Sequence, residues 1–217
     1  MTGMVFWDVD TQYDFMFSDG KLYVPGAEDI LPQLARLSRL ARTRGVRVVA
    51  SVDHHALSDA ELSLSPDYRA TFPPHCLAGS HGAAKVDATR LVDPMFIDQV
   101  PVDAAAVAAH RGEIVFRKQK FDVFSNPNTE AIVAALDPGE IVVYGVAQDV
   151  CNRYAIEGLL QRGYKVTAVR DAMRPIRADV GARLLEEWAA RGVRIADTAS
   201  VIAYVASVVG AATVSGV

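Results

Sequence analysis

The stretch "EIVVYGVAQDVCNRYAIEGLLQRG", residues 140–163, joins an apolar run to a segment with helical periodicity. Residues 140–146 are rich in β-branched side chains, as is typical of a strand that is buried on both faces. Residues 151–163 fit a helix. A buried strand that leads into a helix is the repeating unit of parallel α/β proteins, so this stretch predicts the class of the fold.

The same alternation runs along the rest of the chain. Apolar runs at 5–9, 46–52, 113–117, 165–169 and 193–197 predict further strands. Helices are expected from Ile30 to a stop at Gly45, and at 128–136, 178–191 and 198–209. The pattern predicts an α/β fold, a Rossmann-like three-layer α/β/α sandwich with a mostly parallel sheet of about six strands.

The segment 53–90 breaks this alternation and is rich in Pro, His, Ser and Gly. A loop this long inside a compact domain is usually functional. No internal repeat, low-complexity tract or linker divides the chain. We therefore expect one domain over residues 1–217.

The charges of the chain favour a small-molecule ligand. The 22 basic side chains are scattered and are outnumbered by 26 acidic ones, which argues against nucleic acid or a membrane as partner. No apolar run reaches the roughly 18 residues of a membrane span, and the first residues do not resemble a signal peptide. We expect a cytoplasmic protein whose cysteines, Cys76 and Cys151, are free thiols; one disulfide is the alternative. No Gly-x-Gly-x-x-Gly motif follows the first strand, which argues against a dinucleotide-dependent oxidoreductase.

Four of the predicted strands end in reactive side chains. In parallel sheets, ligands bind beyond the carboxyl ends of the strands. If these strands are neighbours, an acid, an amine, a thiol and candidate metal ligands share one edge of the sheet. The first strand leads to Asp8 and Asp10, the second to Asp53, His54 and His55, the third to Lys118 and Lys120, and the fourth to Asp149 and Cys151.

Cys151 stands at the start of a predicted helix. The helix dipole and a nearby Lys118 would both lower the pKa of its thiol. The thiolate is the form that attacks a carbonyl carbon, so this position suits a nucleophile. The alternative is that Cys151 is a small buried residue that packs at a strand-to-helix corner.

Asp10 and Lys118 are the charged candidates beside this thiol. A carboxylate next to a thiol can accept its proton and later deliver it to a leaving amine. Asp10 has the alternative role of capping a turn. Lys118 has the alternative of a solvated charge at a strand end, with Lys120 as the functional amine instead.

The long segment carries a set of candidate metal ligands, Asp53, His55, Glu61 and His75. Asp-x-His supplies two ligands from one extended segment, and a later Glu and His complete an oxygen-and-nitrogen set that suits Zn, Fe or Mn. Histidines in loops are also often solvated or capping residues. We expect this bystander role for His54, His81 and His110.

Together these segments resemble the isochorismatase-like cysteine hydrolases, and most closely the nicotinamidases, over roughly residues 4–205. "DVDTQYDF" is similar to the family's Asp-x-Gln-x-Asp-Phe opening, which implies that Asp10 is the catalytic acid and that Phe15 lines the pocket. "FRKQKFDVF" resembles the lysine segment and implies Lys118 as the family lysine. "GVAQDVCNRYA" resembles the nucleophile motif and implies Cys151 as the nucleophile.

The resemblance also implies how the substrate oxygen is held. Members commonly have a cis peptide before the alanine of the nucleophile motif, here between Val146 and Ala147. The N–H groups of Ala147 and Cys151 would then form an oxyanion hole, with Val146 beside the substrate.

The metal segment is what resembles the nicotinamidases in particular. "DHH" and "FPPHCLAGSHGAA" are similar to their metal-binding pattern, and Phe72 stands where many of them have a tryptophan of the substrate pocket. The resemblance implies one divalent metal ion, with zinc preferred and iron or manganese as alternatives. The implied ligands are Asp53, His55, Glu61 and His75.

The function implied by the resemblance is hydrolysis of nicotinamide to nicotinate and ammonia, a step of NAD salvage, through a thioester on Cys151, by a homo-oligomer that is a dimer or a tetramer. One alternative is a relative that acts on another amide or on an N-carbamoyl compound. A second is a metallohydrolase in which the metal activates water and Cys151 is structural. A third is a ligand-binding protein on the same fold. An isochorismatase proper is disfavoured because its chemistry requires no nucleophilic cysteine.

Overall fold

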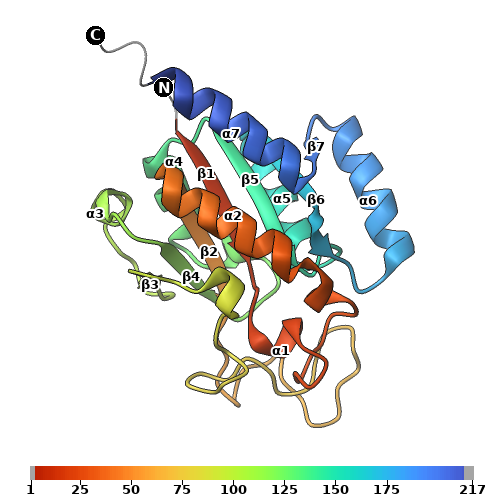
Figure 1. Ribbon diagram of the computed structural model, residues 1–217. Coiled ribbons are helices and arrows are strands. Elements are labelled where there is room, and N and C mark those ends of the chain that lie inside the picture. The colour runs from red at the N-terminus through yellow and green to blue at the C-terminus, as the bar shows by residue number, and fades with distance from the viewer. Residues whose placement is uncertain (1–2, 213–217) are drawn as a thin grey trace.

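The computed structural model describes residues 3–212 and contains one sheet in which every neighbouring pair of described strands is parallel (Figure 1). The strands are β1 (Met4–Val9), β2 (Arg47–Asp53), β3 (Met95–Ile97), β4 (Ile114–Lys118), β5 (Glu140–Val146), β6 (Val166–Arg174) and β7 (Arg194–Ala196). Their order is β3-β4-β2-β1-β5-β6-β7. All six predicted strands are present. The seventh, β3, is an edge strand of 3 residues, too short for its pattern to identify it.

Helices cover both faces of the sheet, which confirms the three-layer sandwich (Figure 1). On one face lie α2 (Leu31–Arg44) and α7 (Thr198–Ala212); on the other lie α4 (Thr129–Leu136), α5 (Cys151–Gln161) and α6 (Ala178–Ala190). The helices α1 (Tyr13–Met16) and α3 (Ala104–Ala109) were not predicted, because 4 and 6 residues give too little periodicity. Three short 3₁₀ turns complete the described elements: η1 (Ala27–Ile30), η2 (Asp87–Thr89) and η3 (Val123–Ser125).

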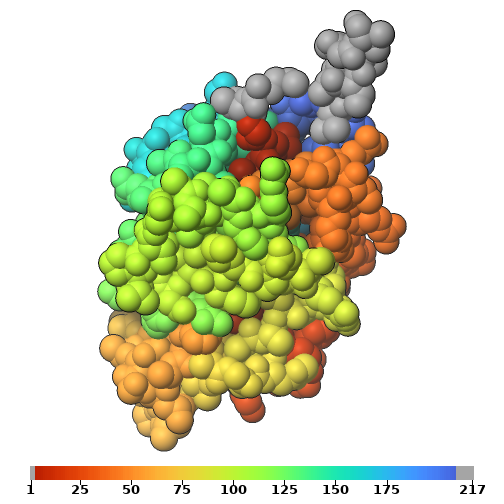
Figure 2. Space-filling view, turned by 90° about the vertical axis from the view of Figure 1, so that its left-hand side faces the viewer, coloured from red at the N-terminus to blue at the C-terminus, as the bar shows by residue number. Residues whose placement is uncertain are grey.

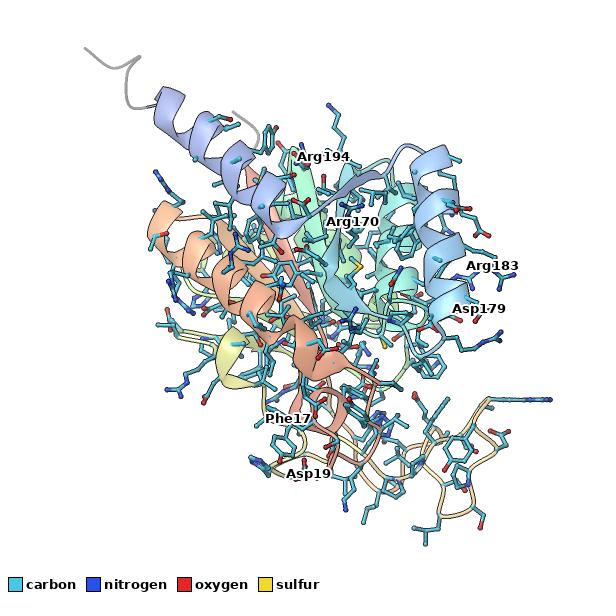
Figure 3. All side chains as sticks on the ribbon, turned by 45° about the vertical axis from the view of Figure 1, so that its right-hand side comes forward. Phe17, Asp19, Arg170, Asp179, Arg183 and Arg194 are labelled. Atoms are coloured by element: carbon cyan, nitrogen blue, oxygen red, sulfur yellow. The ribbon has the colours of Figure 1, made fainter. Side chains whose placement is uncertain are left out.

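Each covering helix buries one stripe of apolar side chains. In α6, Leu184 and Trp188 are buried against the sheet. Asp179 and Arg183 project from the outer side of the same helix, as Figure 3 shows, and their charged atoms lie 3.7 Å apart. This division into an apolar and a charged face holds the helix on the sheet through burial of apolar area.

The central strand β1 alternates its side chains between the two cores. Val5, Trp7 and Val9 belong to the core beneath α4, α5 and α6, whereas Phe6 belongs to the core beneath α2 and α7. Trp7 stacks on Phe116 of β4 with ring centroids 5.9 Å apart. Burial on both faces explains why this strand is apolar at every position except Asp8.

The carboxyl ends of β1 and β5 approach each other closely at Gly145. This residue has a φ of 119°, and a Cβ built on it would lie 2.0 Å from the carbonyl oxygen of Val9. Only glycine fits such an approach without displacing the neighbouring main chain. The residues that follow the two strands, Asp10 and Ala147, are thereby brought to one edge of the sheet.

The segment between β2 and β3 contains no strand and only one 3₁₀ turn, as its composition predicts. It lies at the carboxyl end of the sheet and forms the lower end of the molecule in Figures 1 and 2, where it runs from light orange to yellow. Within residues 3–212, we find no helix with the length and apolar character that crossing a bilayer requires.

Candidate functional site

The site begins with three side chains that four central strands bring together. Asp10 follows β1, Lys118 ends β4, and Cys151 opens α5 directly after the loop from β5. Lys118 Nζ lies 2.8 Å from Asp10 Oδ2 and 3.6 Å from Cys151 Sγ. All three residues are buried, with exposed fractions of 0%, 0% and 7%. The strands β4, β2, β1 and β5 are consecutive in the sheet, so the expected convergence at one edge is confirmed.

Lys118 is a buried cation with two carboxylates around it, Asp10 and Asp53. Burial acts to lower the pKa of Lys118, but the two negative charges hold it well above the ordinary lysine value. The ammonium therefore stays charged at neutral pH.

Cys151 is a neutral thiol in the resting site. Burial raises the pKa of Cys151 well above its ordinary value, Lys118 opposes this, and the charges of Asp10 and Asp53 add to the rise. The prediction of a lowered thiol pKa is therefore wrong: Lys118 lies where it was expected, but burial outweighs its charge. A nucleophilic role for Cys151 consequently requires a base at hand.

Asp10 is held by a neighbour that the sequence patterns did not single out. Ser51 Oγ donates to Asp10 Oδ1 at 2.6 Å, and the N–H of Asp10 donates to the carbonyl of Ser51 at 3.1 Å. Ser51 is buried in β2, beside the end of β1. One carboxylate oxygen of Asp10 thus faces a hydroxyl and the other faces Lys118.

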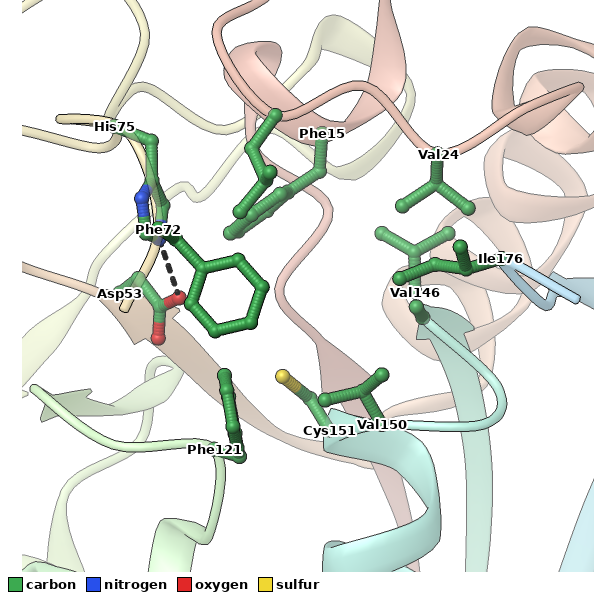
Figure 4. A pocket seen from close by; sticks show the side chains of 12 residues that line it. Phe15, Val24, Asp53, Phe72, His75, Phe121, Val146, Val150, Cys151 and Ile176 are labelled. Atoms are coloured by element: carbon green, nitrogen blue, oxygen red, sulfur yellow. Dashed lines mark ion pairs between the residues drawn. The ribbon is translucent and has the colours of Figure 1, made fainter. Parts of the chain in front are cut away.

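Beside this cluster lie three residues that can hold a metal ion, Asp53, His55 and His75. One ligand atom from each lies within 4.8 Å of the others. Asp53 Oδ2 is 3.5 Å from His75 Nε2, the contact drawn in Figure 4, and 3.9 Å from His55 Nε2. All three residues are buried.

Each of the two histidines has a hydrogen-bond partner at Nδ1, and this directs its Nε2 toward the site. His55 Nδ1 lies 3.2 Å from Asp59 Oδ2, and His75 Nδ1 lies 2.8 Å from the carbonyl oxygen of Pro73. In both rings Nδ1 has an acceptor, which leaves Nε2 as the free lone pair, as in histidines that bind metals. His55 Nε2 is buried without a hydrogen-bond partner. Two imidazoles and a carboxylate are a donor set that fits Zn, Fe or Mn.

Glu61 is not among the three clustered residues. It is half-buried, and burial together with the charge of Asp53 raises its pKa. It lines an adjoining groove with Lys120 and Asp59. Its role as a further ligand stays a prediction, whereas Asp59, which the sequence patterns did not mark, contacts His55 directly.

The other candidates lie apart from these clusters. Lys120 lies in the adjoining groove, and Lys118 alone of the two lysines contacts Asp10. The ring of His81 packs on Tyr13 at 4.1 Å, and His110 Nε2 contacts the carbonyl of Asp93 at 2.8 Å. Both cysteines are free.

A largely apolar pocket opens over the thiol. Figure 4 shows the sulfur of Cys151 directed into it between Phe72, Phe121 and Val150. The rings of Phe72 and Phe121 meet edge to face at 5.4 Å. The predicted lining residues Phe15, Phe72 and Val146 all line it, with Leu22, Val24, Asp53, His75, Phe121, Ala147, Val150, Cys151 and Ile176.

The loop between β5 and α5 contains the expected cis peptide between Val146 and Ala147. The N–H groups of Val150 and Asn152 donate to the carbonyl of Ala147 at 3.1 Å each. Among the described residues, no such backbone hydrogen bond engages the N–H of Ala147 or Cys151. These two donors lie beside the pocket and the sulfur.

Comparison with known proteins identifies relatives of this chain. The sequence model of the isochorismatase domain matches residues 4–200. The nicotinamidase/pyrazinamidase of Mycobacterium tuberculosis is 28% identical over 190 residues, which cover 86% of this chain and 95% of that protein. The nicotinamidase of Escherichia coli is 26% identical over 187 residues, with 77% and 81% covered.

A solved structure shares the fold. The pyrazinamidase of Pyrococcus horikoshii in complex with zinc superposes with a TM-score of 0.71 at 23% identity, covering 89% of this chain and 98% of that one. The family match spans most of the sequence, and the fold accords with it. This chain therefore belongs to the isochorismatase family, as a hydrolase close to the nicotinamidases.

Proposed function

We propose that this protein is a metal-containing cysteine amidohydrolase, and that it converts nicotinamide to nicotinate and ammonia. The observation that carries the proposal is the contact of one buried ammonium, Lys118, with the carboxylate of Asp10 and the sulfur of Cys151 at the floor of an apolar pocket. Similarity to nicotinamidases over most of the chain supports the choice of substrate.

The first step is attack by the thiol. Because the pKa of Cys151 is raised by burial, the sulfur is protonated at rest and must lose its proton as it bonds to the amide carbon. Asp10 accepts that proton, and the ammonium of Lys118 lies 2.8 Å from the Oδ2 atom of Asp10. The negative charge that forms on the substrate oxygen is bound by the N–H groups of Ala147 and Cys151.

The second step is release of ammonia. The C–N bond breaks as Asp10 returns the proton to the leaving nitrogen, and a thioester remains on Cys151. A water molecule, deprotonated by Asp10, then attacks the thioester carbon. The C–S bond breaks, the sulfur regains the proton from Asp10, and the carboxylic acid leaves and loses its own proton to solvent.

The pocket selects a flat apolar ring with one polar edge. Phe15, Phe72 and Phe121 supply aromatic surface, and His75 and Asp53 supply the polar side. A divalent cation, with zinc preferred, held there by Asp53, His55 and His75 would supply a Lewis-acid contact for the ring nitrogen of the substrate. Glu61 is the proposed further ligand. Such two-point binding orients the amide over Cys151 before reaction.

The test is ammonia release from nicotinamide by purified native protein and by Cys151→Ala, with zinc, iron and manganese quantified on the same samples. We expect Cys151→Ala to lose at least about 10³-fold in kcat, because it removes the thiol that lines the pocket, while its metal content is unchanged. Near-native turnover by this variant, or turnover that survives alkylation of the thiol, would mean that a metal-activated water, and not Cys151, is the nucleophile. If the native protein releases ammonia only from N-carbamoyl compounds, such a compound and not nicotinamide is the substrate.

A further inference from the structure

The turn after β1 carries three polar side chains at alternate positions, Asp10, Gln12 and Asp14. The proposed mechanism uses only Asp10. Gln12 and Asp14 are nevertheless buried, with exposed fractions of 0% and 5%. A buried amide and a buried carboxylate need hydrogen-bond partners, and the partners that they have are specific.

Gln12 binds the main chain of Asp53. Its Oε1 accepts from the N–H of Asp53 at 2.7 Å, and its Nε2 donates to the carbonyl of Asp53 at 2.8 Å. Nε2 also donates to the carbonyl of Ala83 at 3.0 Å. The side-chain amide thus holds the backbone on both sides of the Asp53 side chain, as a neighbouring strand would.

Asp14 holds the main chain next to His75. Its Oδ2 accepts from the N–H of Cys76 at 2.7 Å, and its Oδ1 accepts from the N–H of Lys21 at 3.0 Å. The fit is close: a Cβ on Gly82 would lie 2.1 Å from Asp14 Oδ2, so position 82 accommodates glycine only.

The main chain of Cys76 is also hydrogen-bonded to that of the other histidine, His55. The N–H of His55 donates to the carbonyl of Cys76 at 3.1 Å, and the carbonyl of His55 accepts from Ala78 at 2.9 Å. The backbone of the two histidine segments is therefore joined, and Asp14 ties the joined pair to the turn after β1. The segment that bears these histidines has no strand to fix its position.

We propose that Gln12 and Asp14 are positioning residues of the metal site, which hold the main chain of Asp53 and of Cys76, next to His75, so that the three ligand atoms converge. This inference rests on the metal site of the proposed function. Ligands that are fixed in advance bind a metal tightly, because little ordering remains to be done when the ion arrives. One short motif thus supplies the proposed base and the frame of the metal site.

The test compares two neutral, nearly isosteric substitutions, Gln12→Met and Asn128→Leu. Asn128 is a matched control: its Nδ2 donates to the carbonyls of Asp98 and Val100 at 2.9 and 2.8 Å, and its Oδ1 accepts from Val102 at 3.0 Å. It is likewise buried, and it contacts none of the three ligand residues. For each protein we would measure the zinc dissociation constant by competition with a chelator, and the Tm of the metal-free form.

We expect both variants to lose Tm in the metal-free form, because each leaves buried main-chain groups unpaired. The zinc dissociation constant should rise by about 10- to 100-fold in Gln12→Met and stay near the native value in Asn128→Leu. Equal constants in the two variants would overturn the inference. A native protein that binds no zinc would overturn it together with the metal site, whereas loss of ammonia release alone would count only against the proposed reaction.

Asp14→Asn tests the same point at His75 and keeps the inference testable if Gln12→Met does not fold. Its control is Asp19→Asn, which removes a carboxylate from the same segment. Within the described part of the chain, Asp19 accepts only from the hydroxyl of Tyr13, at 2.8 and 3.0 Å. We expect weaker zinc binding in Asp14→Asn than in Asp19→Asn. Equal weakening of zinc binding in the two variants would mean that the lost negative charge accounts for the effect. It would overturn the positioning role of Asp14.

Discussion

Asp53 belongs to both halves of the site. Its Oδ1 contacts the ammonium of Lys118, and its Oδ2 faces His75 Nε2 at 3.5 Å. Burial acts to raise the pKa of Asp53, but Lys118 and the histidines hold it well below the ordinary carboxyl range. The side chain therefore remains an anion, which suits its contact with Lys118 and its proposed role as a ligand. Loss of Asp53 would disturb both halves together.

Ser51 supports a prediction at the same scale. Ser51→Ala removes the hydroxyl that donates to Asp10 Oδ1 at 2.6 Å, and a hydrogen bond to a charged group contributes about 1.5–3 kcal/mol. We expect kcat for amide hydrolysis to fall by roughly 10-fold or more. KM should change little, because Ser51 does not line the pocket. Ser51→Thr keeps the hydroxyl and should recover most of the loss in steady-state assays; a threonine variant as slow as the alanine variant would contradict the role of the hydroxyl.

The elements show which parts of the fold can be predicted from the sequence. The strand at 140–146 was predicted to the residue, because an uninterrupted apolar run marks a strand that is buried on both faces. The short elements β3, α1 and α3 carry less than one clear period of pattern and were missed. The length of β6, which extends to Arg174, was also underestimated, because polar residues interrupt its second half.

The residues of the site likewise divide into those that the sequence indicated and those that it did not. Asp10, Lys118 and Cys151 are reactive side chains at strand ends, where parallel sheets bind ligands, so position and chemistry both indicated them. Ser51 and Asp59 act through hydrogen bonds to other site residues, and nothing in their spacing reveals such partners. The thiol pKa was predicted in the wrong direction because burial is a property of the packed chain.

The junction of β1 and β5 yields a prediction at the scale of elements. Gly145→Ala should unfold at a lower urea concentration than Gly163→Ala, although both residues have positive φ, 119° and 79°. The added methyl at 145 meets Val9 O at 2.0 Å, whereas the one at 163 meets nothing within 4 Å. We expect a loss of about 1 kcal/mol in the free energy of unfolding at 163, and a further 1–3 kcal/mol at 145. Equal losses in the free energy of unfolding, measured by urea titration, would show that position 145 can accommodate a methyl group beside Val9.

At the scale of the whole molecule, one buried tyrosine makes the stability depend on pH in alkaline solution. Tyr144 of β5 is buried in the core beneath α2 and α7. Burial raises its pKa well above the ordinary tyrosine value, and the charge of Asp8 adds to the rise. In the folded protein this hydroxyl therefore keeps its proton at a pH where the unfolded chain loses it. Stability associated with this group is present at neutral pH and is lost as the pH rises beyond about 10.

Tyr144→Phe tests this dependence. The native free energy of unfolding should fall by about 1.4 kcal/mol per pH unit more steeply than that of the variant above pH ~10, because only the native unfolded chain releases this proton. Below pH ~9 the two proteins should show parallel pH dependence. Urea titrations at a series of pH values measure the two slopes, and identical slopes in alkali would mean that Tyr144 ionises in the folded state.

The proposed reacting groups and part of the pocket wall come from different parts of the chain. Asp10 and Lys118 stand at the ends of the central strands β1 and β4 and Cys151 opens α5, whereas Phe72 lies in the segment between β2 and β3 and Ile176 in the connection after β6. The proposed chemistry is thus carried by the edge of the sheet, and part of the pocket wall is carried by connections. Substrate preference in this enzyme can be redesigned by grafting loops, with the chemical machinery left in place.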